Sequence, residues 1–149
     1  MSPKIKWPND IYVNHSKIAG ILIENSIFGS NIKRSIVGIG ININQTIFDT
    51  GNYNSFKLIN KKENNIHRIL EYLLYRFNTY YDQITDPDCK LQHEFDSYLY
   101  GKNDLRNFKT HDNVEIQARI SGTTVEGKLK LTLENGDVRC YNHKEVIFN

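Results

Sequence analysis

Two isoleucine-rich runs near the start of the chain limit its fold most strongly. Residues 17–24 read KIAGILIE and residues 35–44 read SIVGIGININ, and the residues between them contain Gly29-Ser30-Asn31. β-Branched residues favour strands, and a continuous apolar run is typical of a strand covered on both faces. We therefore expect a doubly covered strand over 17–24, a turn over 25–34 and a further strand over 35–44.

Shorter patterns predict strands before these runs. The first predicted strand covers residues 4–7 and stops at Pro8. A turn at Asn9 and Asp10 follows it, and a second strand covers 11–13. Residues 14–16 fit a hairpin loop. Residues 49–60 are rich in Asn, Gly and Ser and predict a surface loop. The start of the chain is therefore predicted to be mainly β-structure.

The middle of the chain predicts two helices. Apolar residues recur with the helical period from Ile66 to Ile84, and Asp86-Pro87-Asp88 would end that helix because a proline disfavours helical geometry in its predecessor. A shorter helix is predicted over 89–100, with Gly101 as its C-cap.

From Asp104 the pattern changes to short alternating strands. Strands are predicted over 114–118, 125–133, 138–141 and 145–148, and Asn135-Gly136 is a strong hairpin signal. About 45 residues of closely spaced strands predict a small β-barrel of the SH3-like type. The whole chain is therefore predicted to be α+β.

Composition excludes several classes of function. A net charge of +2 gives no electrostatic footprint for nucleic acid, and no apolar run approaches the length of a bilayer span. The two cysteines, Cys89 and Cys140, form no metal-spaced pair, and the five histidines have no metal-ligand spacing. We expect a reduced, cytoplasmic protein that binds neither nucleic acid nor membrane.

Single residues in the β-rich part allow more than one interpretation. Lys17 can aim its ammonium at an anion, or can simply extend to solvent from a strand end. Asn9 and Asp10 can contact a ligand or form an ordinary turn. Gly38 and Gly40 can let a ligand approach the strand or relieve crowding against a helix. Asn42 can offer its amide to a base edge or bond a neighbouring loop. Ile43 breaks the dinucleotide-binding fingerprint, which excludes a Rossmann fold.

Three segments together are more specific than any residue alone. KWPND at 6–10, KIAGILIE at 17–24 and GIGIN at 38–42 resemble, in order and spacing, the biotin protein ligase (biotin–acetyl-CoA-carboxylase ligase) family. The resemblance implies part of a catalytic domain like that of class II aminoacyl-tRNA synthetases over 1–103 and an SH3-like domain over 104–149. Trp7 is expected to be a packing residue.

The same resemblance implies an activity and a site. Family members use ATP and Mg²⁺ to convert biotin to biotinyl-5′-AMP and transfer biotin to a lysine of the biotin carboxyl carrier protein of acetyl-CoA carboxylase. Lys17 matches the catalytic lysine, and Asp10 matches a position near the metal. The biotin and adenylate contacts are expected at Lys6, Asn9, Asp10, Gly20, Ile21, Gly40 and Asn42.

One family feature has no counterpart in this sequence. A Gly/Arg-rich loop of the type GRGRxG lies upstream of KWPND in the family, and only five residues precede that string here. We therefore expect the C-terminal part of a ligase, weakly active or inactive alone, whose unpaired sheet edges favour a homodimer. The alternatives are a non-catalytic binding module, a fragment of a biotin-repressor type of protein, and a relative of lipoate–protein ligases.

Overall fold

The computed structural model describes residues 2–49, 51–84 and 90–148. They form two compact units, one containing Asn9–Gln83 and one combining Lys4–Pro8 with the chain from Ile84 onward. We call them unit 1 and unit 2 and describe each by itself. The predicted domain division between residues 103 and 104 stays a prediction.

Unit 1 is built on three antiparallel strands, β2 (Asp10–Val13), β3 (Ser16–Phe28) and β4 (Asn31–Ile41). β2 and β3 are joined by Asn14 and His15, whose φ angles of 49° and 63° are both left-handed. Two left-handed residues match the twist of a tight hairpin, and asparagine tolerates this conformation well. The predicted hairpin loop at 14–16 is thus confirmed for its first two residues, while Ser16 already belongs to β3.

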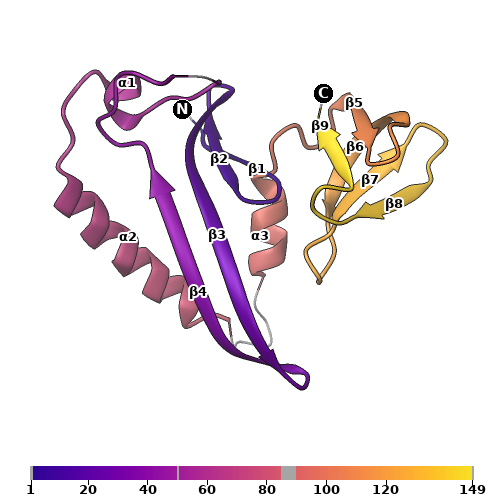
Figure 1. The fold of residues 1–149 in the computed structure, drawn as a ribbon, viewed down its shortest axis with the longest axis horizontal. Helices are drawn as coiled ribbons and strands as arrows, with labels where there is room; N and C mark the ends of the chain where they lie inside the picture. The colour runs from indigo at the N-terminus through magenta and orange to yellow at the C-terminus, as the bar shows by residue number, and fades with distance from the viewer. Residues whose placement is uncertain (1, 50, 85–89, 149) are drawn as a thin grey trace. The chain divides into compact units, whose positions relative to one another are not determined.

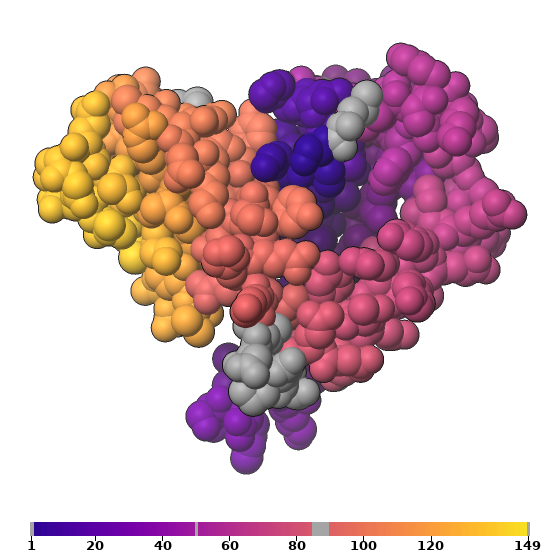
Figure 2. Space-filling view, turned by 180° about the vertical axis from the view of Figure 1, so that it is seen from behind, coloured from indigo at the N-terminus to yellow at the C-terminus, as the bar shows by residue number. Residues whose placement is uncertain are grey.

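The β3–β4 hairpin is longer than the sequence predicted. Pairing continues through Asn25 opposite Ser35, where the Ser35 hydroxyl donates to Asn25 Oδ1 at 2.6 Å. The predicted turn over 25–34 is therefore wrong except at Gly29 and Ser30. Full coverage of residues 17–24 is also wrong, because Leu22 is 62% exposed. Figures 1 and 2 both show the tip of this hairpin extending past the end of α2.

The helices of unit 1 lie after β4 in the chain. α1 (Phe56–Asn60) falls inside the predicted loop and is capped by Ser55, whose hydroxyl accepts from Leu58 N and donates to Gln45 O. α2 (Ile66–Tyr81) is capped by Asn65 and ends three residues before the predicted Ile84. The predicted stop at Asp86-Pro87-Asp88 lies outside the described residues. None of the described helices is long and apolar enough to cross a bilayer.

The described part of unit 2 contains one helix, one short strand and a five-stranded sheet. β1 (Lys4–Lys6) pairs with the segment after the helix, with Ile5 N donating to Tyr98 O at 2.8 Å. The helix α3 runs from Leu91 to Ser97, shorter than predicted, and the predicted start at Cys89 lies outside the described residues. Gly101 is not its cap, since Tyr98 holds that position and Gly101 adopts φ 69° in a later turn.

The main sheet of unit 2 has the order β8-β7-β6-β5-β9 and is antiparallel throughout. Its strands are β5 (Leu105–Thr110), β6 (Glu115–Thr123), β7 (Leu129–Leu133), β8 (Val138–Tyr141) and β9 (Val146–Phe148). The sequence did not predict β5, and β7 begins late because Gly127 takes a turn with φ 82°. The Asn135-Gly136 hairpin is confirmed, with Leu133 N donating to Asp137 O.

Unit 2 holds the hydrophobic core of the described chain. Phe108, Ile120 and Leu131 are almost fully buried, and Trp7 packs with them at 7% exposure. The Trp7 indole also donates to Gly127 O at 2.9 Å, so its predicted packing role is confirmed. In the described chain β8 and β9 stay at opposite edges, without closure into a barrel. The fold is therefore α+β with two antiparallel sheets.

Candidate ligand pocket of unit 1

An ion pair lies where β2 meets the start of β3. Asp10 opens β2 and faces Gly20 in the strand register, and its Oδ1 lies 2.6 Å from Lys17 Nζ. The two side chains are 30% (Lys17) and 25% (Asp10) exposed, so solvent screens the pair only in part. Asp10 thus holds the one lysine that the sequence predicts to be catalytic.

The backbone of Lys17 is held independently of its side chain. Its N–H donates to Asn52 O at 2.8 Å, and its carbonyl accepts from Asn54 N at 2.9 Å. The segment around Tyr53 therefore runs beside the start of β3 and fixes the point from which the ammonium extends.

Gly20 leaves the space that the ion pair occupies. A Cβ at this position would lie 3.2 Å from Asp10 Oδ1 and 3.3 Å from Lys17 Nζ, which is closer than side chains ordinarily approach. Gly40 lies opposite Gly20 in the register, where a Cβ would meet only Gly20 O at an ordinary 3.9 Å. The two glycines make a patch without side chains, and only at Gly20 would a Cβ crowd its neighbours.

Asn9 and Ile21 hold the two strands together. The Asn9 amide donates to Ile21 O at 2.7 Å, and Ile21 N donates back to Asn9 O at 2.9 Å. This reciprocal pair fixes the residue before Asp10 against β3. The geometry therefore gives Asn9 a structural contact, and its predicted contact with an adenylate stays a prediction.

Asn42 bonds a neighbouring loop. Its amide donates to Asn54 O at 3.1 Å, while its backbone N–H donates to Ile18 O at 2.8 Å. Of the two interpretations of Asn42, the loop contact is thus observed, and a contact with adenine stays a prediction.

Four of the predicted site residues line one pocket of about 390 Å³. Its walls are formed by Lys17, Ala19, Gly20, Gly40, Ile41, Asn42, Gln45 and Tyr53. Asp10 does not line the pocket but forms an ion pair with Lys17, which does. Asn9 and Ile21 also lie outside the lining and are hydrogen-bonded to each other. The structure thus brings Lys17, Gly20, Gly40 and Asn42 together at one pocket, and their roles in binding a ligand stay a prediction.

Two wall residues were not predicted. Gln45 and Tyr53 come from a segment to which the sequence assigned no site, and Tyr53 stacks on Phe48 with ring centroids 5.8 Å apart. No local motif marks either residue. Only the pairing of residues 52–54 with Lys17 brings Tyr53 to the pocket.

Lys6 does not line this pocket. It belongs to unit 2, where its ammonium lies 5.4 Å from the ring centroid of Phe148. Its predicted contact with biotin or adenylate stays a prediction.

The pocket combines one ammonium, amide groups and an aromatic ring. A partly desolvated ammonium stabilises anionic oxygens, and a ring wall suits a flat or apolar group. Among the described residues no group of three His, Cys, Asp or Glu side chains could hold a metal ion. The ammonium and amide groups of the pocket suit an organic anion.

A known protein family matches the first part of the chain. Residues 2–42 match the biotin/lipoate A/B protein ligase family. The matched stretch contains Asp10 and six of the eight residues that line the pocket, with Gln45 and Tyr53 outside it.

Several relatives extend the match along the chain. A bifunctional ligase/repressor BirA of Bacillus spizizenii is 28% identical over 144 residues, covering 93% of this chain and 44% of the relative. The chloroplastic biotin–protein ligase 1 of Arabidopsis thaliana is 30% identical over 129 residues, covering 83% and 34% respectively. The chain therefore spans less than half the length of these relatives.

Solved structures match the fold. The apo biotin protein ligase of Aquifex aeolicus superposes with a TM-score of 0.78 at 22% identity, covering all of this chain and 66% of that one. The same ligase in complex with biotin and ATP gives a TM-score of 0.77 at 21% identity. The relatives match this chain along most of its sequence, and the fold agrees with that match. The chain therefore belongs to the biotin protein ligase family.

Proposed function

We propose that this chain carries the lysine-centred part of a biotin-activating site and acts in the ATP-dependent attachment of biotin to protein. The observation that supports this most is the position of Lys17, held by Asp10 in a pocket lined by Gly20, Gly40 and Asn42. These residues lie within the stretch that matches the ligase family. The Aquifex ligase, whose fold this chain shares in part, was solved with biotin and ATP.

The proposed chemistry has two steps. A carboxylate oxygen of biotin attacks the α-phosphorus of ATP, the bond to the β-phosphate oxygen breaks, and pyrophosphate leaves with biotinyl-5′-AMP formed. The amine of an acceptor lysine then attacks the biotinyl carbonyl, loses a proton and releases AMP. Both reactants of the first step are anionic, so an ammonium at Lys17 would lower their repulsion and stabilise the charge in the transition state.

Asp10 is proposed to position Lys17. Its oxygen would hold the ammonium against Gly20 until a substrate carboxylate or phosphate replaces that contact. Mg²⁺ bound with ATP would neutralise phosphate charge, and Asp10, the ion-pair partner of Lys17, is a carboxylate that would suit such an ion. Asp10 also forms the ion pair with Lys17, so it would have to bind Mg²⁺ while keeping this ion pair.

The acceptor is proposed to be a biotin carboxyl carrier protein. A relative from Paracoccus denitrificans is named biotin–acetyl-CoA-carboxylase ligase. It is 51% identical over 39 residues, which are 26% of this chain and 16% of the relative. The strands after residue 104 are proposed to be an SH3-like domain following a partial class II synthetase-like domain. A cytoplasmic location fits the free, exposed thiol of Cys140.

The chain alone is proposed to be weakly active. Unit 1 buries few apolar side chains in its described part, Val13 and Ile18 among them, and none of α2. Most of the α2 apolar face is exposed, including Leu70 at 49% and Leu74 at 54%. A pocket built on so little packing would be poorly ordered, and ordered geometry is what accelerates adenylation.

A homodimer through β4 is part of this proposal. β4 is an edge of its sheet, and Ile32 and Ile36 on it are 62% and 52% exposed. An exposed apolar edge strand offers unpaired N–H and C=O groups to another strand. Two β4 strands can pair antiparallel about a twofold axis, which gives a closed dimer.

Product analysis tests the function. The chain, biotin, ATP and Mg²⁺ are mixed at micromolar protein, biotinyl-5′-AMP is measured by mass spectrometry, and transfer to a carrier domain is measured with streptavidin. Slow, ATP-dependent adenylate formation is expected. Lipoyl-5′-AMP in its place would indicate a lipoate ligase relative, and carrier binding without adenylate would indicate a binding module; either result contradicts the proposal.

A further inference from the structure

Gln45 lines the ligand pocket of unit 1 at a position to which the sequence assigned no site. Within the described residues its hydrogen bond is a backbone one, from the Ser55 hydroxyl to Gln45 O, and its side-chain amide has no partner. Asn42 differs, because its amide already donates to Asn54 O at 3.1 Å. Gln45 is therefore the wall residue whose amide donor and acceptor both stay open to a ligand.

The backbone that carries Gln45 is held at two successive residues. Ser55 is fully buried, and its hydroxyl donates to Gln45 O at 2.6 Å while it accepts from Leu58 N at 3.2 Å. Asn44 Nδ2 donates to Asn64 O at 2.9 Å, and Asn64 N donates to Asn44 Oδ1 at 3.0 Å. A fixed backbone leaves only the side chain of Gln45 to be ordered when a ligand binds, which lowers the entropy lost.

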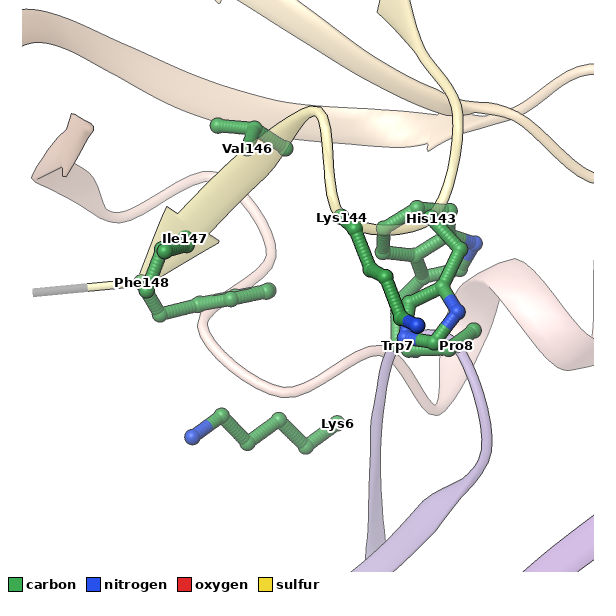
Figure 3. Close-up of a pocket in the computed structure, with 8 residues that line it drawn as sticks. All are labelled: Lys6, Trp7, Pro8, His143, Lys144, Val146, Ile147 and Phe148. Carbon is green, nitrogen blue, oxygen red and sulfur yellow. The ribbon is translucent and has the colours of Figure 1, made fainter. Parts of the chain in front are cut away.

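Two pockets of unit 2 lack such an open amide. One has a volume of about 270 Å³, and none of its eight lining residues carries an amide side chain (Figure 3). The other contains Gln92, whose amide donates to Thr123 O at 2.9 Å and is thus bonded within the protein. Of these three pockets, the one with an open amide is the pocket that contains Lys17.

We propose that Gln45 is a specificity residue for the nucleotide of the adenylation step, with its amide oxygen accepting from the N6 amino group of adenine and its amide nitrogen donating to N7. A carboxamide and this edge of adenine match as a bidentate pair. The ring of Tyr53 gives the same wall a flat surface against which a base can lie. Ser55 is the positioning residue, because it acts on the base through Gln45. The inference rests on the proposed ligase function and adds the residue that selects the base.

Calorimetric titration of ATP and of ITP into the whole chain, with Mg²⁺ and saturating biotin, tests the proposal. ITP carries an oxygen in place of the N6 amino group and keeps N7, the ribose and the triphosphate. The unmodified chain is expected to bind ATP about tenfold more tightly than ITP. Gln45→Leu should bring the two affinities within about twofold, mainly by weakening ATP. Gln83→Leu, an exposed change of the same kind outside the pocket, should keep the preference.

Variants of two helix caps separate positioning from general stability. Ser55→Ala should lower the preference for ATP several-fold, and Ser55→Thr, which keeps the hydroxyl, should restore it. Asn65→Ala is the matched control, because Asn65 caps α2 as Ser55 caps α1 but does not bond Gln45. It should lose a similar amount of stability and leave the preference unchanged. Circular dichroism checks that each variant folds.

Three results would each overturn the role of Gln45. They are equal binding of ATP and ITP to the unmodified chain, an unchanged preference in Gln45→Leu, and equal losses of preference in Ser55→Ala and Asn65→Ala. If biotin binding still depends on Lys17 in these cases, the ligase function stands and only the role of Gln45 fails. A chain that binds neither nucleotide contradicts both.

Discussion

The Oδ1 atom of Asp10 lies 2.6 Å from the ammonium of Lys17, across the junction of two strands. Asp10 comes from the KWPND segment and Lys17 from the next one, so the ion pair joins two family motifs in space. The ammonium is held at the wall of a pocket without being buried inside it. A charge that is held but still accessible can exchange its carboxylate partner for a substrate anion.

Gly20 and Gly40 should respond differently to alanine. Gly20→Ala places a methyl group against both members of the ion pair, so we expect weaker biotin binding and a destabilisation of about 1 kcal/mol. Gly40→Ala meets only an ordinary contact and should leave the free energy of unfolding nearly unchanged, although its methyl group would lie at the pocket wall. Urea unfolding and calorimetric titration measure the two effects. Equal behaviour of the two variants would contradict the packing assigned to Gly20.

Trp7 should contribute strongly to the stability of unit 2. Trp7→Ala removes a buried indole from the core and should cost about 3–5 kcal/mol of unfolding free energy. Trp7→Phe keeps most of the ring but loses the hydrogen bond to Gly127 O, at a cost of about 1–3 kcal/mol. The control is Val125→Ala, since Val125 is 88% exposed. A Trp7→Phe variant as stable as the original chain would show that the indole hydrogen bond contributes nothing.

Acid should destabilise unit 2 through its hydrogen-bonded carboxylates. Hydrogen bonds from Asn142 hold the pKa of Glu145 below its usual value, and a hydrogen bond from Thr110 does the same for the pKa of Asp112. The folded-state pKa lies below the unfolded one, so this stability is fully present above the unfolded pKa, about pH 4, and is lost as pH falls through the folded pKa.

Thermal unfolding between pH 7 and pH 3 measures this loss. Glu145→Gln should reduce the acid dependence of Tm, because the variant has no carboxylate to protonate at this position. Glu134→Gln, an exposed change of the same kind, serves as the control. An unchanged acid slope in Glu145→Gln would exclude Glu145 as a source of the effect.

Self-association should depend on β4. Ile36→Lys places a charge on the exposed edge strand and should shift the chain toward monomer in sedimentation equilibrium, with the dimer dissociation constant raised about tenfold or more. Val125→Lys changes an exposed valine of unit 2 in the same way and should have no such effect. A monomer at high concentration before any substitution would contradict the dimer.

Local signals in the sequence predicted much of the fold. The period from Ile66, the tight turn at Asn14 and the Asn135-Gly136 hairpin each depend on neighbouring residues, and all three are observed. The extent of the β3–β4 hairpin was missed because polar Asn25 and Ser26 resemble turn residues, whereas cross-strand pairing keeps them extended. Long-range pairing is not visible in a local pattern.

The same distinction applies to the pocket. Lys17, Gly20, Gly40 and Asn42 lie in ordered motifs with fixed spacing, and the structure brings all four to one pocket; their roles in binding a ligand stay a prediction. Tyr53 was missed because only its pairing beside Lys17 brings it to the wall. Lys6 belongs to unit 2 and does not line this pocket, so its contact with biotin or adenylate stays a prediction.

Calorimetric titration of biotin in the presence of Mg²⁺ and ATP tests the central claim most directly. The unmodified chain should bind biotin, Lys17→Gln should lose at least about tenfold in affinity, and Asp10→Asn should lose several-fold while remaining folded. Lys33→Gln, an exposed lysine of β4, should bind as the unmodified chain does. Biotin binding that is absent from the unmodified chain, or equal in Lys17→Gln and Lys33→Gln, would contradict a biotin site centred on Lys17.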